Sequence, residues 1–268
     1  MLSGQQIDRA AYSIIADLQK AGFAAYLVGG AVRDMLLDIV PKDYDISTNA
    51  TPEEIKKIFG RSARIIGRRF KIVHVYRGSN LYELSTFRRN PTEEERKARE
   101  TDDGKMVWRD NTWGTIEEDA MRRDFTANAL YLDPLKENEI LDFCGGVADI
   151  QNKVVRCLGE PDVRFEEDPV RMLRALKLVA QYDFHLEESI ETSIKANCEK
   201  IGLVSQRRLY EELLKITYKP YSVKTWLSCE RTHLLESLFP GLDFMLGTVD
   251  REKQVGLIMD RDIRVAQG

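Results

Sequence analysis

Apolar positions recur along the first twenty residues at intervals of three and four, which predicts an amphipathic helix. Ser3 is its expected cap, and Gly22 marks its expected end. The next segment, AAYLVGGAVRDMLL, predicts a short strand, a tight turn at the paired glycines and a second helix. TPEEIKKIF predicts a third helix, because Thr51 can cap it and Glu54 can complete a capping box.

Strand-like patterns dominate the next stretch, in KDYDIST, ARIIG, KIVHVYR and LYELSTF. In KIVHVYR the residues alternate, so Ile72 and His74 lie on one side of the strand, with Val73 and Val75 on the other. Residues 88–113 are charged and have no period, which predicts a long loop that is either functional or mobile. Beyond this loop the pattern is helical, with brief strand signals in ALYL and EILDF.

A change of pattern divides the chain. From residue 165 to about residue 247 the periodicity predicts helices only, whereas strands and helices mix before that point. The predicted fold class is therefore α+β, with an all-helical part after the mixed part. We expect three regions, a mixed head over residues 1–150, a helical part over 151–247 and a C-terminal tail over 248–268.

Composition narrows the possible classes of protein. With 43% hydrophobic and 31% charged residues in 268, the chain can bury a core and is not a disordered tail. Its 40 basic and 44 acidic residues give a net charge of −4, which excludes a basic coat over the whole chain but not a local basic patch. The cysteines and histidines form neither C-x-x-C nor H-E-x-x-H. No apolar run is long enough for a membrane span, so we expect a cytoplasmic protein without membrane contact.

Three acidic residues are candidates for metal-dependent chemistry. Asp43 and Asp45 would point to the same face of a strand, where two carboxylates repel one another unless a cation neutralises them. A D-x-D sequence alone is more often a solvated turn. Glu83 lies in a strand of apolar and small residues, where a carboxylate needs a partner or a metal unless the strand faces water. Together, the three acids could form a two-metal site for phosphoryl transfer.

Paired glycines supply a candidate phosphate site. Gly29 and Gly30 stand between the predicted strand and helix, where backbone N–H groups can approach an anion. Such a pair more often only makes a tight turn. The spacing matches neither G-x-G-x-x-G nor the P-loop motif, so neither of those nucleotide folds is indicated.

A basic pair lies in MRRDFTANALY. Arg122 and Arg123 could bind phosphate oxygens, and Asp124 and Asn128 could reach ribose hydroxyls. The alternative is a helix surface crossed by ion pairs.

A further acid–base pair lies in EEDPVRMLRALK. On one helix, Asp168 and Arg171 would share a face and could present a hydrogen-bonding edge to a base. Spacing alone favours an ordinary ion pair within the helix. Residues 61–71 carry five basic side chains and no acid, which could bind backbone phosphates or form a solvated cationic face.

Several of these segments occur together in one protein family. VGGAVRDMLL, KDYDISTNATPEE, RRDFTANAL and EDPVRMLRALKLVAQ, in this order, resemble the class II nucleotidyltransferases, which include tRNA CCA-adding enzymes and bacterial poly(A) polymerases. The resemblance runs from about residue 24 to residue 180 and continues more weakly to about residue 245. IIGRRFKIVHV and WRDNTWGTIEEDAMRRDFTANALYLD resemble the poly(A) polymerase branch.

The resemblance implies a small mixed-sheet head, like that of polymerase beta, followed by a helical neck. It also implies site roles. The metal-binding carboxylates would be Asp43 and Asp45, with Glu83 as the third catalytic acid. The nucleotide-binding residues would be Gly29, Gly30 and Arg33 at the triphosphate, Arg122, Arg123, Asp124 and Asn128 at ribose and phosphate, and Asp168 and Arg171 at the base.

The implied activity is addition of AMP from ATP to RNA 3′ ends with two Mg²⁺ ions, on mRNA or tRNA. One alternative is a tRNA CCA- or A-adding enzyme, and another is a truncated, non-catalytic relative that binds RNA or nucleotides. Family members usually continue well past the end of this chain, into helices that hold RNA. We therefore expect weak RNA binding and release of the RNA after each addition.

Overall fold

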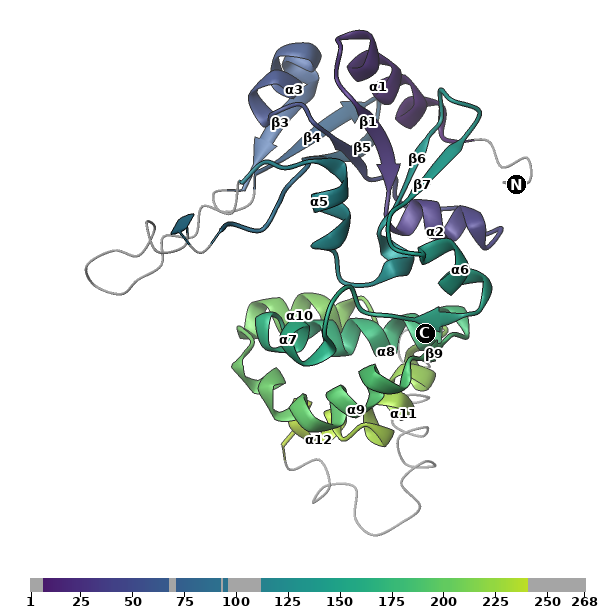
Figure 1. The fold of residues 1–268 in the computed structure, drawn as a ribbon, viewed down its shortest axis with the longest axis vertical. Coiled ribbons are helices and arrows are strands. Elements are labelled where there is room, and N and C mark those ends of the chain that lie inside the picture. The colour runs from purple at the N-terminus through teal and green to yellow at the C-terminus, as the bar shows by residue number, and fades with distance from the viewer. Residues whose placement is uncertain (1–6, 68–70, 93, 96–111, 241–268) are drawn as a thin grey trace. The chain divides into compact units, whose positions relative to one another are not determined.

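A computed structural model describes residues 7–67, 71–92, 94–95 and 112–240 of the chain. The chain forms two compact units, Met1–Ile150 and Gln151–Gly268. The first unit combines a sheet with helices, and the second consists almost entirely of helices (Figure 1). This composition of the two units is the one that the sequence pattern predicts. In the part of the chain that the structure describes, no helix has both the length and the apolar character needed to cross a membrane.

A seven-stranded mixed sheet forms the frame of the first unit, in the order β3-β4-β5-β2-β1-β6-β7. Neighbouring strands run antiparallel, except β2 and β5, which are parallel. The strands are β1 (Ala25–Val28), β2 (Ile46–Thr48), β3 (Ala63–Ile66), β4 (Ile72–Arg77), β5 (Asn80–Thr86), β6 (Leu130–Asp133) and β7 (Glu139–Asp142). ALYL and EILDF are thus confirmed as strands, and they pair with each other at one edge of the sheet.

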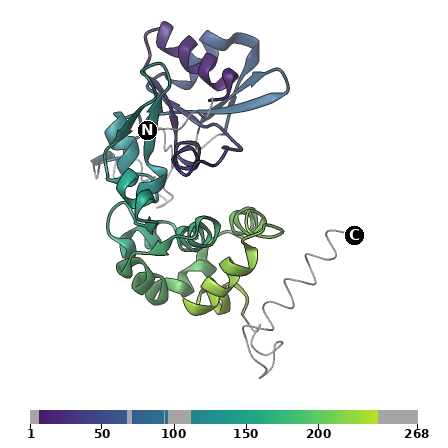
Figure 2. The same ribbon diagram turned by 90° about the vertical axis from the view of Figure 1, so that its right-hand side faces the viewer.

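Helices α1 and α3 cover the same face of this sheet. Helix α1 packs on β1, α3 packs on β3 and β4, and the two helices contact each other (Figures 1 and 2). The predicted alternation in β4 is confirmed, because Val73 and Val75 are fully buried while Ile72 and His74 are not. The helices of this unit are α1 (Arg9–Lys20), α2 (Gly30–Leu36), α3 (Pro52–Phe59), α5 (Ile116–Met121) and α6 (Gly146–Gln151), with short 3₁₀ turns at Gly60–Ser62 and Thr126–Asn128.

The predicted cap of the third helix is confirmed, whereas that of the first helix is not. Helix α3 has the predicted capping box, in which the side chains of Thr51 and Glu54 each bond to the other's backbone N–H. The prediction that Ser3 caps the first helix is wrong. Asp8 caps α1 instead, because its Oδ1 accepts hydrogen bonds from the N–H groups of Ala10 and Ala11 at 3.0 and 2.9 Å.

Strand β2 is shorter than the sequence predicts. It begins at Ile46, so Asp43 and Asp45 lie in the extended segment just before the strand and not within it. The cause is the neighbouring strand β1, which ends at Val28 where the turn at Gly29 begins. The last hydrogen bond of this ladder joins the Val28 N–H to the Asp45 carbonyl at 3.0 Å. In the described structure, the residues that precede Asp45 therefore do not pair with β1.

In the second unit the helices are α7 (Pro161–Glu167), α8 (Val170–Tyr182), α9 (Glu188–Asn197), α10 (Gln206–Leu214), α11 (Ser222–Arg231) and α12 (Leu234–Leu238), with a 3₁₀ helix at Cys198–Leu203. Helix α8 buries an apolar face and packs against α7, α10 and α11. The prediction of helices only is wrong at one point. Asp183 adopts a left-handed conformation (φ 56°) that ends α8, and β9 (His185–Leu186) then pairs in parallel with β8 (Val154–Val155).

Two predictions concern segments that the structure describes only in part. The ends of the predicted loop 88–113 meet in an isolated bridge between Arg88 and Trp113, but residues 96–111 lie outside the described residues. The predicted tail 248–268 also lies outside them. The four cysteines form no disulfide.

Candidate active site

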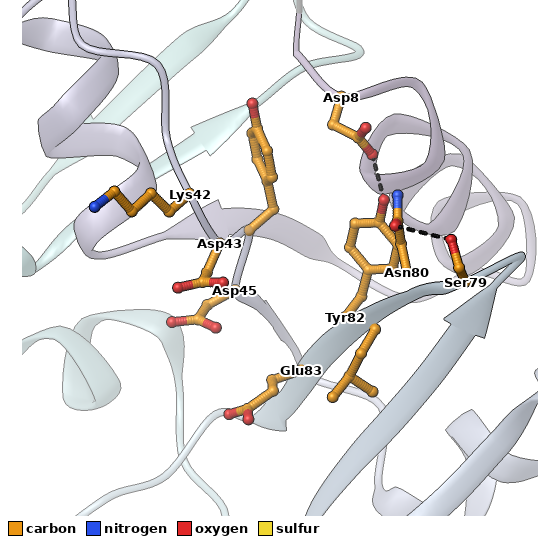
Figure 3. A pocket seen from close by; sticks show the side chains of 10 residues that line it. Asp8, Lys42, Asp43, Asp45, Ser79, Asn80, Tyr82 and Glu83 are labelled. Carbon is orange, nitrogen blue, oxygen red and sulfur yellow. Dashed lines mark hydrogen bonds between the residues drawn. The ribbon is translucent and has the colours of Figure 1, made fainter. Parts of the chain in front are cut away.

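The parallel pairing of β2 with β5 brings the candidate acids together. In this register Ile46 lies opposite Leu84, so Asp45 and Glu83, each one residue earlier, are neighbours at the end of the ladder. Figure 3 shows the carboxylates of Asp43 and Asp45 beside each other, with Glu83 extending from β5. The three acids line one cavity of about 680 Å³, together with Lys42 and residues of the β4–β5 turn. The fold therefore brings all three predicted acids to one cavity.

Asp45 is electrostatically strained in this position. Burial among protein atoms raises the pKa of its carboxyl to about 6, and the neighbouring Glu83 and Asp43 carboxylates add to the rise. The Arg123 guanidinium acts in the opposite direction. Asp45 lines the cavity and its residue surface is exposed there, so a cation can reach the carboxyl even though protein atoms surround much of it. A cation at this point would relieve that crowding.

The donor set fits a magnesium site built on two carboxylates. Among the described residues, no three His, Cys, Asp or Glu side chains are already arranged to hold a metal ion. Glu83 instead faces His74 on β4, with His74 Nε2 at 3.6 Å from Glu83 Oε1. Mg²⁺ commonly uses one or two carboxylates and completes its shell with water and substrate phosphates. Asp43 and Asp45 provide hard oxygen ligands of this kind.

The paired glycines form the turn between β1 and α2. Gly29 has φ 72° and ψ −128°, a backbone conformation that residues other than glycine rarely adopt, and it is the N-cap of α2. Its N–H donates to the Leu130 carbonyl at 3.0 Å. A Cβ at this position would lie 3.4 Å from Nη1 of Arg123 and 3.5 Å from the Asn128 carbonyl oxygen. Gly30 begins α2 and lies near the side chain of Arg33.

Three of the predicted nucleotide-binding residues gather around this turn. Arg33 donates through Nη1 to Asn128 Oδ1 at 2.5 Å, and its other guanidinium nitrogens bond to Asp34. The Asn128 amide in turn donates to Asp124 Oδ1 at 3.1 Å. Arg33 and Asp124 are both nearly buried. The chain Arg33–Asn128–Asp124 therefore links α2 to the segment after α5. Arg122, at the end of α5, is half-buried.

Arg123 belongs to a second buried network whose other members the sequence did not reveal. Asp119 accepts from Arg123 at 3.0 Å, from the Tyr131 hydroxyl at 2.7 Å and from the Arg88 N–H at 3.0 Å. Arg123 also donates to Tyr131 and to Ser47 on β2, and its guanidinium lies 5.3 Å from the centre of the Tyr131 ring. The spacing of Asp119 and Arg123, four apart, was the available signal.

The prediction that Asp168 and Arg171 share a helical face is wrong. Asp168 lies between α7 and α8 with an extended backbone (φ −155°, ψ 90°), because the following residue is Pro169 and the α conformation is disfavoured before proline. Its side chain pairs with Arg208 at 2.5 Å. Arg171 donates to the Arg164 carbonyl and pairs with Glu167, both at 2.8 Å.

Known families match both units. Residues 25–156 match the family described as the Poly A polymerase head domain, and residues 183–246 match that described as the probable RNA and SrmB-binding site of polymerase A. Poly(A) polymerase I of Haemophilus influenzae is 41% identical over 243 residues, which cover 90% of this chain and 53% of that protein. The CCA-adding enzyme of Lactobacillus helveticus is 39% identical, covering 85% and 54%. The chain belongs to the class II nucleotidyltransferases.

Solved structures of this family share the fold. The CCA-adding enzyme of Bacillus stearothermophilus in complex with CTP has a TM-score of 0.74 and 33% identity, covering 92% of this chain and 56% of that chain. The Thermotoga maritima CCA-adding enzyme complexed with tRNA has a TM-score of 0.68 and 25% identity, covering 88% and 54%. This class II nucleotidyltransferase spans about half the length of the curated relatives that it matches.

Proposed function

We propose that this chain catalyses template-independent transfer of AMP from ATP to the 3′ end of an RNA. The observation that carries the proposal is that Asp43, Asp45 and Glu83 line one cavity beside the glycine turn. The sequence relatives of this chain include poly(A) polymerase I. The helical unit is the part that we expect to hold the RNA, since it matches an RNA-binding family. The free cysteines support a cytoplasmic location.

In the proposed reaction, the RNA 3′ oxygen forms a bond to the α-phosphorus of ATP while the bond to pyrophosphate breaks. Asp43 and Asp45 would hold two Mg²⁺ ions, which lower the pKa of the attacking hydroxyl and stabilise the leaving phosphates. The Gly29–Gly30 turn offers the N-terminal end of α2 to the triphosphate. Arg33 and Asn128 lie at that turn and would orient the phosphates and the ribose.

A second candidate function is tRNA CCA or A addition. The specific observation in its favour is that solved CCA-adding enzymes share the fold, and that one such relative is 39% identical to this chain. A third is nucleotide or RNA binding without catalysis. Crowded carboxylates argue against this reading, because a binding module gains nothing from side chains that repel one another.

One incorporation experiment separates the three functions. The pure protein is incubated with each labelled nucleotide in turn, once with a tRNA that lacks its 3′ end and once with an unstructured oligonucleotide. The proposal predicts ATP incorporation into both RNAs. Strong CTP incorporation restricted to the tRNA would establish CCA addition instead. Absence of incorporation from every nucleotide into both RNAs would indicate a non-catalytic relative.

The role of Asp168 and Arg171 in base selection remains part of this proposal. Each already has a partner in the helical unit, so base recognition would require Asp168 to leave Arg208, or to share it. We expect Asp168→Ala or Arg171→Ala to lower the preference for ATP over CTP by about tenfold, with a smaller change in triphosphate affinity. An unchanged preference in both variants would assign base selection to other residues.

A further inference from the structure

A concentration of positive charge follows the outer edge of the sheet. Between Glu54 and Gly78 the sequence contains eight lysines and arginines and no acidic residue, in a chain whose net charge is −4. The described part of this segment forms most of α3, the turn Gly60–Ser62 and strands β3 and β4, and β3 is the outermost strand of the sheet (Figure 1). The proposed reaction gives this charge no role.

Two arginines of this segment are available to a ligand. Lys71 and Arg77 each pair with an acidic side chain, at 2.7 and 2.9 Å, and Lys56 donates to two backbone carbonyls at 2.6 Å. Arg61 and Arg64 are exposed, and among the described residues no acidic side chain pairs with either of them. Their charge is therefore open to an anion from solution.

Arg64 shares its face of the sheet with an exposed aromatic ring. Val73 and Val75 are fully buried on the side that α3 covers, so the alternation of β4 sends Tyr76 to the opposite side. Tyr76 is 38% exposed there, and the Arg64 guanidinium lies 5.9 Å from the centre of its ring. Sites for single-stranded nucleic acids combine such rings, on which bases stack, with cations for the phosphates.

A row of paired residues connects this surface to the acids. In the register of the sheet, His74 lies opposite Arg64 on β3 and opposite Glu83 on β5. Since neighbouring strands are about 4.8 Å apart, the backbone at Arg64 lies about 10 Å from that at Glu83. The surface is separate from the acid cavity, whose lining includes none of Arg61, Arg64 and Tyr76. An RNA whose 3′ end lies at the acids could therefore reach it with nucleotides further back in the chain.

The chemistry of the surface favours RNA over an acidic protein segment. The arginines alone would accept any polyanion. A nucleotide supplies both a phosphate for a guanidinium and a flat base that stacks on Tyr76, whereas an acidic peptide uses the arginines only. The acids of the cavity repel phosphates, so cations beside them would compensate for part of that repulsion along the RNA.

We propose that the basic edge, formed by Arg61, Arg64 and Tyr76, binds single-stranded RNA a few nucleotides before its 3′ end. The arginines hold phosphates, and Tyr76 stacks on a base. The inference rests on the proposed function and deepens it, because it adds a binding surface on the head to the RNA binding expected of the helical unit.

The salt dependence of RNA binding tests the two arginines. The full chain is titrated without ATP, at several salt concentrations, with a labelled, unstructured oligonucleotide. Arg61→Gln and Arg64→Gln should each weaken binding about two- to tenfold at low salt and lower the slope of log K against log salt by about 0.7, the value for one phosphate contact on a single strand. An unchanged slope in both variants, or a wild-type protein that binds no RNA, would overturn the inference.

A matched control separates contact from net charge. Lys136→Gln removes the same charge from the exposed turn between β6 and β7, at the opposite edge of the sheet, and should leave the slope unchanged. A slope that falls equally in Lys136→Gln and in the arginine variants would show a general effect of net charge and overturn the inference.

Tyr76→Leu tests the stacked base. It should weaken binding about tenfold and leave the salt slope unchanged, because the ring contacts a base and not a phosphate. Tyr12→Leu is the control, since Tyr12 on α1 is 44% exposed and lies outside the basic edge. Wild-type affinity in Tyr76→Leu would overturn the inference.

Polyglutamate tests the alternative partner. The wild type and both arginine variants are titrated with it under the same conditions. If Arg61→Gln and Arg64→Gln weakened binding of polyglutamate but left binding of RNA unchanged, the basic edge would bind an acidic protein segment, and the inference would be wrong.

Kinetics distinguish failure of this inference from failure of the proposed function. If the wild-type chain incorporates AMP, Arg64→Gln should raise KM for a long RNA, but not for a dinucleotide acceptor that is too short to reach the basic edge, and should leave KM for ATP unchanged. An increase in KM for ATP alone would place Arg64 with the nucleotide and contradict the inference. A wild-type chain that incorporates no nucleotide would refute the proposed function, whereas the salt slopes would still decide the basic edge.

Discussion

The acids at β2 and β5 and the basic residues around the glycine turn form opposite kinds of site. Asp43 and Asp45 are open to solvent and repel each other, and burial together with its neighbours raises the pKa of Asp45 to about 6. Arg123, by contrast, is held by Asp119, Tyr131 and Ser47 within one network. Both groups were predicted from the sequence as one functional set, but their energetics differ.

This difference in energetics indicates that the Asp119–Arg123 network stabilises the fold, whereas the acid pair serves the chemistry. The Asp119–Arg123 network joins α5, β2 and β6, so it stabilises the head whether or not a nucleotide is present. The acid pair stabilises nothing by itself, since ionising the second carboxylate beside the first costs free energy. We therefore expect substitutions at the acids to remove activity while sparing the fold, and substitutions in the network to affect the fold first.

The largest expected effect is on activity at the acid pair. Asp43→Asn or Asp45→Asn should lower the rate of AMP incorporation on the order of 10²–10³-fold or more, the range for losing one electrostatic contact to the transition state. Neither variant should lose its fold, because each substitution removes a repulsive charge. Incorporation is measured with saturating ATP and RNA, and folding by circular dichroism. A rate near wild type in either variant would refute the proposed metal site.

Arg123→Met should act mainly on stability. It leaves the buried Asp119 carboxylate without its cation, although Tyr131 and the Arg88 N–H still donate to it, so we expect a loss of about 2–3 kcal/mol in the free energy of unfolding. Urea denaturation measures this. Arg207→Met is the matched control, since that arginine is exposed and its pair with Glu211 should contribute at most about 0.5 kcal/mol.

The same two variants, Arg123→Met and Arg207→Met, could also show that Arg123 is a functional residue and not a structural one. If Arg123→Met were as stable as Arg207→Met but failed to bind ATP, Arg123 would belong with the acids as a functional residue. Its guanidinium is near enough to Asp45 to oppose the rise in that residue's pKa, so both roles are physically open to it. Stability and ATP affinity must therefore be measured on the same preparations.

Gly29→Ala should have a smaller effect on stability. Its backbone conformation (φ 72°, ψ −128°) is strained for alanine, although the added Cβ would find room at ordinary contact distance, so we expect a cost of about 1–2 kcal/mol. Gly202→Ala is the control, because it has no positive φ and nothing lies within 4 Å of the point where its Cβ would stand. Thermal unfolding of the two variants compares them. Equal midpoints would show that the turn tolerates a side chain.

The sequence predicts well those structural features that are determined by residues close together in the chain. The capping box of α3 and the alternation in β4 are set by side chains within a few positions of one another, and both are confirmed. Pro169 carried enough information to place Asp168 outside a helix, because proline disfavours the α conformation of the preceding residue. That residue pair was predicted from spacing alone.

Long-range features of the site could not be predicted in the same way. The register that sets Asp45 beside Glu83 depends on the parallel pairing of two strands nearly forty residues apart, and no local pattern encodes it. Asp119 looked like one of several surface acids in IEEDAM, yet it is buried at the centre of a network. The late start of β2, at Ile46, follows from where β1 ends, which is likewise a property of the sheet.

Stability as a function of pH tests the acid pair most directly. Because the pKa of Asp45 rises from its ordinary value of 3.8 to about 6 on folding, the folded state holds this proton more tightly than the unfolded state. Ionising Asp45 therefore costs stability as the pH rises from about 4 through 6, and the full cost is present above that. Asp45→Asn avoids this cost, and Mg²⁺ should offset it in the wild type.

The measurement is the thermal unfolding midpoint of the wild type and Asp45→Asn from pH 4 to pH 8, with and without Mg²⁺. We predict that the variant is the more stable protein at pH 7.5 without Mg²⁺, that the difference disappears towards pH 4, and that Mg²⁺ raises the midpoint of the wild type far more than that of the variant. Parallel pH curves, together with an equal response of both proteins to Mg²⁺, would contradict a cation site at Asp43 and Asp45.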